Sequence, residues 1–293
     1  MKRILLIIIG VGLLVAIGLA IPFIYLSHTR SFTEVTIPAN GYDLTGYLSE
    51  GSGEAEQWVI FGHGNRKEAE DHPLYRQILN NLPEEVGVLA IDFRGFGRST
   101  DENLENSEEV FDRGEDIQAA VAYLIDHKGI AENQIILIGH SFGAAQVAHA
   151  AHDRAYSLVI PIGLGDWQTM TSDVNQLMRY LRKYEQNTGV IVSRENLLEE
   201  GLRFTPQAIT QPCPIAPIAF VFAGFDDGKE PMQTQYLQER EHCPTLIGWE
   251  VVPFANHTYG TEEARLPAPL KSLYSKITLS YLVWRIERLI SNH

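Results

Sequence analysis

The chain has 293 residues, of which 45% are hydrophobic and 20% charged, so its composition is that of a globular protein with a sizeable core rather than of a disordered one. The formal net charge of −14 makes the surface repel polyanions, which excludes nucleic acid as an expected partner. The 2 cysteines are too few for a disulfide-rich scaffold. The length fits one large domain.

The chain begins with a long apolar segment. No Lys, Arg, Asp or Glu falls within residues 4–26, and a helix over this range would be about 34 Å long, enough to cross a hydrocarbon core of about 30 Å. Lys2 and Arg3 precede it, and Arg30 is the first such cation after it, which favours a cytosolic N-terminus. We therefore expect residues 1–30 to be an uncleaved single-pass signal-anchor, with the globular part periplasmic or extracellular. A cleaved signal peptide is the alternative, although its apolar region is usually shorter.

The next residues carry strand and helix patterns in alternation. Residues 32–38 and 42–49 alternate apolar and polar side chains around Asn40-Gly41, which predicts an antiparallel hairpin. Continuously apolar runs, typical of strands buried on both faces of a parallel sheet, follow at 57–62, 86–93, 134–139, 157–163, 218–224 and 247–254. Helical patterns occur at 73–82, 110–128, 142–153 and 269–290. This alternation predicts an α/β fold, with a mostly parallel eight-stranded sheet and helices on both faces.

One connection contains no strand pattern. Within about 165–211 the chain has only two helical stretches, 173–184 and 194–202. Apolar residues share one face of the first stretch: Val174, Leu177, Met178 and Leu181. We expect these helices to form a small cap inserted into a single domain of residues 31–293. The alternative is a peripheral helix pair with no role in binding.

A serine stands at the junction between the apolar run 134–139 and the helix that follows it. Gly139 and Gly143 flank Ser141 at two residues on either side, so strand and helix can approach each other closely around a strained turn. Such a turn would expose the Ser141 hydroxyl at the carboxyl edge of the sheet. An ordinary turn with an N-cap serine is the alternative.

A serine hydroxyl is a weak nucleophile that needs a base, and the base needs a group to orient it. Asp226 and Asp227 follow one later apolar run, and His257 follows the next. Because the carboxyl ends of parallel strands meet at one edge of a sheet, we expect these groups to lie near the serine. The backbone N–H groups of Asn65 and Phe142 are candidate oxyanion donors. These residues indicate acyl transfer.

Together, these motifs resemble those of the α/β-hydrolase superfamily, from about residue 32 to the C-terminus. The similarity rests on five segments, at 62–65, 92–100, 139–143, 224–231 and 256–260. In the acid motif the family commonly has Gly-x-x-Asp and a proline four residues later, which matches Gly224, Asp227 and Pro231. The resemblance therefore implies Asp227 as the triad acid, and Asp226 stays as the alternative. The histidine often found before that glycine is absent here.

The resemblance implies a serine hydrolase that cleaves a carboxylic ester or thioester of a small-molecule acyl substrate through an acyl-enzyme. Ser141 would attack, His257 would carry the proton and Asp227 would orient the imidazole. The serine at position 141 sets the chain apart from relatives with an aspartate nucleophile. A small-peptide or amide hydrolase is the alternative enzyme. A non-catalytic binding protein that retains the fold is the alternative of another class.

We expect no cofactor and no metal, because His63, His140 and His257 each lie in a hydrolase motif and lack ligand spacing. Four aromatic residues are candidates either for an apolar acyl pocket or for the core: Phe96, Trp167, Phe225 and Tyr259.

The two cysteines each precede a predicted strand. If those strands are parallel neighbours, Cys213 and Cys243 lie at the same edge of the sheet and within reach of a disulfide. Such a bridge would be consistent with an extracytoplasmic location.

Overall fold

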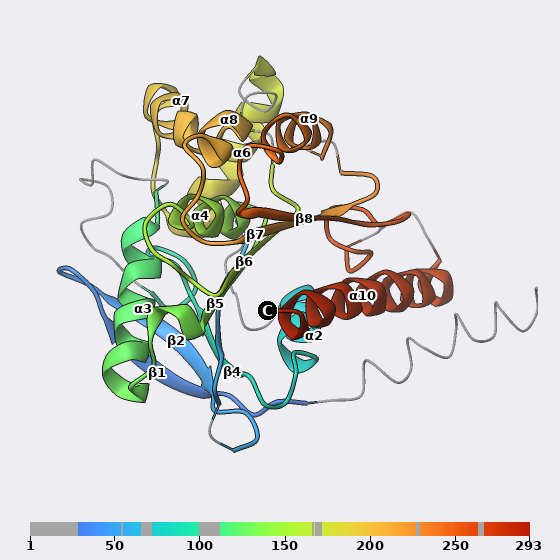
Figure 1. The fold of residues 1–293 in the computed structure, drawn as a ribbon. Coiled ribbons are helices and arrows are strands. Elements are labelled where there is room, and N and C mark those ends of the chain that lie inside the picture. The colour runs from blue at the N-terminus through green and yellow to red at the C-terminus, as the bar shows by residue number, and fades with distance from the viewer. Residues whose placement is uncertain are drawn as a thin grey trace, which may run out of the picture.

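The structure of the chain is a computed structural model that describes residues 29–53, 55–65, 72–99, 112–165, 167, 172–226, 229–262 and 267–293 (Figure 1). The expected membrane segment, residues 4–26, lies outside these ranges. Among the helices within them, none is both long enough and apolar enough to cross a bilayer.

Eight strands form one sheet in the described part of the chain, in the order β1-β2-β4-β3-β5-β6-β7-β8. Their bounds are Thr33–Pro38 (β1), Asp43–Ser49 (β2), Trp58–Gly62 (β3), Gly87–Ile91 (β4), Ile135–His140 (β5), Leu158–Ile162 (β6), Ile218–Ala223 (β7) and Leu246–Val252 (β8). β2 runs antiparallel to both β1 and β4, and all the other neighbours are parallel. The first two strands turn at Asn40-Gly41, where Gly41 has a φ of 87°. The predicted α/β fold with a mostly parallel eight-stranded sheet is therefore confirmed.

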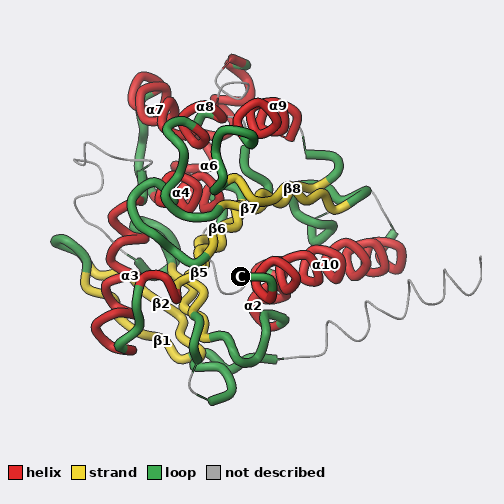
Figure 2. Tube along the Cα trace, viewed as in Figure 1, coloured by secondary structure: helices red, strands yellow, loops and turns green. Residues whose placement is uncertain are grey.

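Helices cover both faces of this sheet (Figures 1 and 2). One face carries α2 (Pro73–Asn80) and α10 (Ala268–Ser291), and the other carries α3 (Gly114–Lys128), α4 (Phe142–Ala150) and α9 (Lys229–Glu239). Between β6 and β7 the chain forms α6 (Val174–Thr188), α7 (Arg194–Gly201) and α8 (Pro206–Thr210), which we call the inserted helices. They lie beyond α4, on the same side as α9 (Figure 1). Short 3₁₀ turns occur at Glu132–Gln134 (η2) and Leu202–Phe204 (η3).

The strands are apolar throughout because each one supplies two cores. In β5, Ile135 and Leu137 pack toward α3 and α4, whereas Ile136 and Ile138 pack toward α2 and α10. All four side chains are fully buried. This two-sided burial explains why the sequence shows continuous rather than alternating apolarity.

Cys213 and Cys243 are joined in a disulfide, with 2.07 Å between the sulfur atoms. Cys213 precedes β7 and Cys243 precedes β8, and these two strands are parallel neighbours. The bridge therefore lies at the amino edge of the sheet, away from the edge where the strands end.

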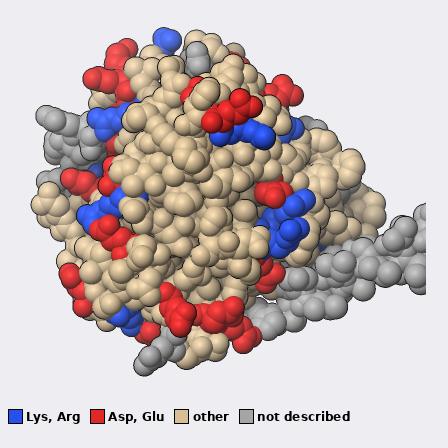
Figure 3. All heavy atoms as spheres, in the orientation of Figure 1, with Lys and Arg blue, Asp and Glu red and all other residues tan. Residues whose placement is uncertain are grey.

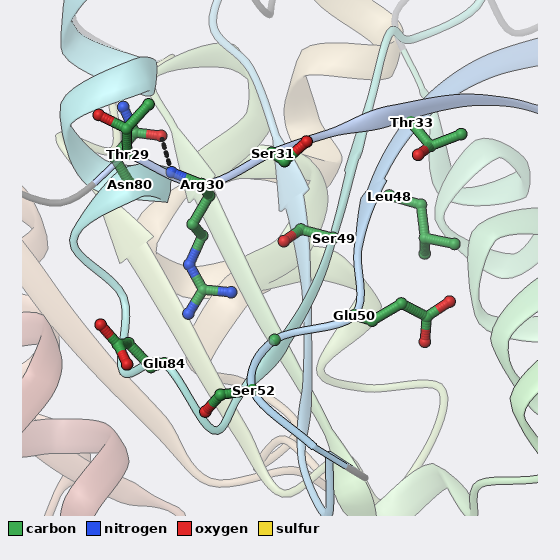
Figure 4. A pocket seen from close by; sticks show the side chains of 11 residues that line it. Thr29, Arg30, Ser31, Thr33, Leu48, Ser49, Glu50, Ser52, Asn80 and Glu84 are labelled. Carbon is green, nitrogen blue, oxygen red and sulfur yellow. Dashed lines mark hydrogen bonds between the residues drawn. The ribbon is translucent and has the colours of Figure 1, made fainter.

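The start of the described chain is also held at this amino edge. The Arg30 guanidinium donates to the carbonyl oxygens of Val86 at 2.9 Å and Leu82 at 3.0 Å, in the turn that leads into β4. Acidic side chains gather along the lower margin of the molecule in the view of Figure 3. The backbone N–H of Arg30 donates to Asn80 Oδ1 at 3.2 Å (Figure 4).

A cavity of about 490 Å³ lies next to Arg30, and Figure 4 shows Glu50 and Glu84 on its wall.

Candidate active site

Ser141 occupies a strained turn between β5 and α4. Its φ of 55° is positive, a conformation that residues with a side chain rarely adopt. A Cβ atom on Gly139 would lie 2.2 Å from Gly143 O, and one on Gly143 would lie 2.3 Å from Gly62 O. Only glycine fits at these two positions, so the close contact between β3, β5 and α4 holds the serine at the carboxyl edge of the sheet.

His257 contacts both Ser141 and a carboxylate. Its Nε2 lies 2.9 Å from Ser141 Oγ, and its Nδ1 lies 2.9 Å from Asp226 Oδ2. A carboxylate can only accept a hydrogen bond, so this contact assigns the proton to Nδ1 and leaves Nε2 free to accept the serine proton. The side chain of His257 is 41% exposed, and that of Asp226 is 8% exposed.

The carboxylate at His257 thus belongs to Asp226, which the sequence analysis kept as the alternative acid. Asp227, the expected acid, lies outside the described residues. Both acids follow β7 and differ by one position, so the motif alone separates them poorly.

Gly163, directly after β6, makes room for the acid and the histidine. It has a φ of 60°, and a Cβ atom there would lie 3.2 Å from both Asp226 Oδ2 and His257 Cε1. The sequence analysis missed this residue. Its signal is a glycine at the carboxyl end of a strand, next to the strand that carries the serine.

A chain of three hydrogen bonds, two of them buried, connects the turn after β3, the end of β5 and the loop that carries His257. Gly64 N–H donates to the Tyr75 hydroxyl at 2.8 Å, and this hydroxyl lies 3.3 Å from His140 Nδ1. His140 Nε2 in turn lies 2.9 Å from the carbonyl oxygen of His257. With Tyr75 as donor to Nδ1, His140 carries its proton on Nε2 and donates it to that carbonyl. Tyr75 lies within a predicted helix, and nothing in the helical pattern marks its role.

The two turns that carry the predicted oxyanion donors lie next to each other. Asn65, 7% exposed, follows β3, and Phe142, 3% exposed, opens α4. A Cβ atom on Gly64 would lie 3.2 Å from Ser141 Cβ, which shows how closely the first turn approaches the serine. Phe142 is the first residue of α4, where unpaired N–H groups and the helix dipole favour negative charge.

His63 connects the turn that carries Asn65 to the residues after β4. The ring is fully buried, with Nδ1 2.6 Å from Gly64 O and Nε2 3.0 Å from Phe93 N. A backbone N–H only donates, so Nε2 accepts and Nδ1 carries the proton. Burial lowers the pKa of His63, against the smaller opposite effect of the Asp92 carboxylate. No group of three or more metal-ligating side chains occurs in the described ranges.

Three of the four candidate pocket aromatics lie in the core, and two of these pack against residues of the site. Phe96 is fully buried and packs against the Phe142 ring, with centroids 5.7 Å apart. Tyr259 is also fully buried and lies against His140 at 6.4 Å. Burial, reinforced by the charge of Asp226, raises the pKa of Tyr259 well above its usual value.

Trp167, the third core aromatic, packs among the inserted helices, whereas Phe225 lies at the surface. Trp167 packs against Tyr180 of α6 at 5.4 Å and against Phe204 at 5.8 Å. Phe225, next to Asp226, is 66% exposed and contacts Phe254, which is 73% exposed, at 6.4 Å. The four aromatic residues therefore do not line one common pocket.

Comparison with known proteins agrees with this architecture. The model of the alpha/beta hydrolase family matches residues 59–288. An α/β hydrolase of Acanthamoeba polyphaga mimivirus is 24% identical over 133 residues, which cover 45% of this chain and 48% of that protein. A multifunctional-autoprocessing repeats-in-toxin protein of Vibrio vulnificus is 28% identical over 131 residues, 42% of this chain and 2% of the toxin. The chain thus matches about half the length of the first relative and a small part of the second.

Solved structures share the fold at low identity. A Pyrococcus furiosus esterase aligns with a TM-score of 0.55 and 16% identity over 85% of this chain and 92% of its own. An acylaminoacyl peptidase of Pyrococcus horikoshii aligns with a TM-score of 0.60 and 13% identity over 87% of this chain and 41% of its own. A serine hydrolase homologue from Coxiella burnetii aligns with a TM-score of 0.54 and 16% identity over 88% of this chain and 99% of its own. With the family model matched from β3 into α10, the chain belongs to the α/β hydrolase family.

Proposed function

We propose that the chain is a serine hydrolase that cleaves a carboxylic ester or thioester through an acyl-enzyme. The observation that carries the proposal is that His257 lies 2.9 Å from both Ser141 Oγ and Asp226 Oδ2. This arrangement of nucleophile, base and orienting carboxylate is the one that makes a serine hydroxyl reactive.

In the proposed reaction, His257 Nε2 accepts the Ser141 proton while Oγ attacks the acyl carbon of the substrate. Asp226 holds the imidazole and stabilises its charged form. The backbone N–H groups of Asn65 and Phe142 bind the negative charge that develops on the carbonyl oxygen. His257 then gives its proton to the leaving alcohol or thiol, and a water molecule hydrolyses the acyl-enzyme by the same route in reverse.

The apolar surface beside the site favours an ester or thioester with an apolar group over a peptide. Phe225 precedes Asp226, and Phe254 lies three residues before His257, so exposed aromatic rings flank two of the three reacting groups. An acyl or aryl group could cover these rings and remove their surface from water.

Labelling with a fluorophosphonate probe, followed by an acyl-chain-length series of p-nitrophenyl esters beside aminoacyl p-nitroanilides, tests the proposal. We expect the probe to label wild type at Ser141 and not Ser141→Ala, which should lose activity by a factor on the order of 10⁶. Faster turnover of the anilides would favour the small-peptide or amide hydrolase. Failure to label wild type, or equal labelling of Ser141→Ala, would favour a non-catalytic binding protein.

We also propose that residues 4–26 anchor the chain in a membrane, with the hydrolase domain outside the cytosol. Their length and apolarity support the first part, and the Cys213–Cys243 disulfide supports the second. The full chain should remain in the membrane fraction after alkaline carbonate extraction, and a chain starting at residue 29 should not. Release of the full chain into the carbonate supernatant, or recovery of a mature protein lacking residues 1–20, would contradict the anchor.

A further inference from the structure

One turn of α6 contacts both residues that carry the predicted oxyanion donors. The Tyr184 ring lies 6.3 Å from the ring of Phe142, and the Asn187 side-chain amide donates to Asn65. Residues three apart on a helix lie on the same side of it, so one surface of this inserted helix reaches both turns. Phe142 follows β5 and Asn65 follows β3, and α6 contacts both of them.

The side chain of Asn187 holds Asn65 by two hydrogen bonds, one to its backbone and one to its side chain. Asn187 Nδ2 lies 3.1 Å from the backbone carbonyl oxygen of Asn65 and 2.8 Å from its side-chain Oδ1. An amide nitrogen has two protons, one for each acceptor. A flipped Asn187 amide would place its own oxygen against two acceptors, so the orientation is chemically determined. Backbone and side chain of Asn65 are thus held together, which restricts its rotation.

The same contact leaves one donor of Asn65 without a partner. Its Oδ1 accepts from Asn187, so its Nδ2 points elsewhere, and among the described residues this buried nitrogen has no hydrogen-bond partner. A buried donor without a partner is unfavourable and uncommon in native proteins. Its presence one residue after Gly64, whose turn touches Ser141, is consistent with a substrate oxygen as its acceptor.

The inserted helices are themselves fixed to the body of the protein. The Tyr184 hydroxyl accepts from Arg113, a fully buried residue at the start of α3. The neighbouring Asp112 donates its N–H to Glu200 Oε2 at 2.9 Å and accepts from Arg203 at 2.7 Å. The Arg113 bond holds α6 itself, and the Asp112 bonds hold α7 and η3 beside it, so Asn187 has a defined place from which it can act on Asn65.

We propose that Asn187 is a positioning residue for the oxyanion hole: α6 aligns the Asn65 turn through it, and the hole is complete only while this helix is docked. The proposal rests on the proposed function, since it presupposes that Asn65 stabilises an oxyanion. Asn187 acts through Asn65 and needs no contact with the reacting atoms. Loss of its two bonds should therefore weaken transition-state stabilisation more than substrate binding.

The test compares Asn187→Ala and the isosteric Asn187→Asp, which lacks both donated protons, with Gln186→Ala, an exposed amide on the same helix. Rates are expressed per serine labelled by fluorophosphonate, so a misfolded fraction does not count. We expect kcat to fall about 10- to 100-fold in both Asn187 variants, with KM changed less than about threefold. Affinity for a trifluoromethyl ketone, whose adduct places an oxyanion in the hole, should fall in parallel.

Gln186→Ala should keep kcat within about twofold of wild type, as expected for a surface side chain. Wild-type kcat and ketone affinity in both Asn187 variants would overturn this inference while leaving the proposed function intact. A larger rise in KM than fall in kcat would overturn it too, because it would assign Asn187 to substrate binding. Failure of wild type to label at Ser141 would instead remove the proposed function.

Discussion

The carboxylate of Asp226 lies 2.9 Å from Nδ1 of His257, and its side chain is 8% exposed. In Asp226→Asn, an amide NH₂ in this position would favour the other imidazole tautomer, which cannot accept the serine proton. We expect kcat to fall by a factor on the order of 10⁴, with little change in KM. The measurement is a steady-state assay with the p-nitrophenyl ester that wild type hydrolyses fastest.

The matched variant is Asp227→Asn, one residue along the same loop. It should retain at least about a tenth of wild-type kcat, because no role in orienting His257 is proposed for it. If Asp227→Asn is the more damaging of the two, the triad acid is Asp227, as the family motif implies.

Gly163→Ala should reduce activity through contact with the acid and the histidine. Gly163 and Gly129, the C-cap of α3, have φ values of 60° and 66°, but a Cβ atom on Gly129 would meet nothing within 4 Å. Both alanine variants should lose about 1–2 kcal/mol of unfolding free energy, measured in urea. Only Gly163→Ala should lose kcat, by about 10- to 100-fold. Equal kcat in the two variants would show that activity does not depend on the absence of a Cβ atom next to Asp226 and His257.

Tyr75→Phe should loosen the loops of the site without touching the nucleophile. It removes the acceptor of Gly64 N–H, and a buried unsatisfied donor costs about 1–3 kcal/mol of unfolding free energy. We expect a drop in kcat of about tenfold as His140 and the Asn65 turn lose their alignment. Tyr123→Phe, on a ring that stacks on His127 of α3, is the control. A stability loss with unchanged kcat would limit Tyr75 to a structural role.

The stability of the fold should decrease in mild acid because of His63. Burial lowers its folded-state pKa below the unfolded value of 6.5, so the unfolded chain binds more protons below about pH 7. The free energy of unfolding should therefore fall as the pH drops from about 7 to 5, by up to about 1.4 kcal/mol per pH unit for this one proton. Urea unfolding at several pH values measures it, and His63→Gln should flatten the slope. An unchanged slope in that variant, or NMR titration of the His63 ring above pH 6.5, would contradict the assignment.

Removing the disulfide should affect stability and spare the chemistry. Cys213 and Cys243 are 30 residues apart in sequence, and closing a loop of this size stabilises a fold by about 3–4 kcal/mol in the chain-entropy model. Cys213→Ser/Cys243→Ser should unfold at lower urea but keep wild-type kcat at 25 °C, because the bridge lies at the edge opposite Ser141. A variant that is folded by circular dichroism yet has lost kcat would contradict this separation.

Most of the framework could be predicted because local patterns determine it. The apolar runs marked the strands, and glycines at 139 and 143 marked the serine turn, since no other residue fits those contacts. The choice between Asp226 and Asp227 could not be made from the motif, because it depends on which carboxylate the loop after β7 turns toward His257.

The inserted helices were harder to interpret from periodicity. Val174 and Met178 share an apolar spacing with Leu177, yet they are 54% and 43% exposed, whereas Leu177 is buried. α6 instead directs Tyr184 and the polar Asn187 toward the site, where long-range partners satisfy them. A periodicity argument assigns polar residues to solvent, so it cannot detect a partly buried amide whose partner is 122 residues away.

The bonds of Arg30 to Val86 and Leu82 bear on how the proposed hydrolase would reach its substrate. These bonds tie the chain to the turn before β4, at the edge of the sheet where the parallel strands start, while Ser141 lies at the edge where they end. If residues 4–26 are embedded as proposed, only a few residues separate the lipid from Arg30. The edge of the sheet that carries Ser141 then faces away from the membrane, and the proposed hydrolase would take its substrate from the aqueous phase rather than from the lipid of its own membrane.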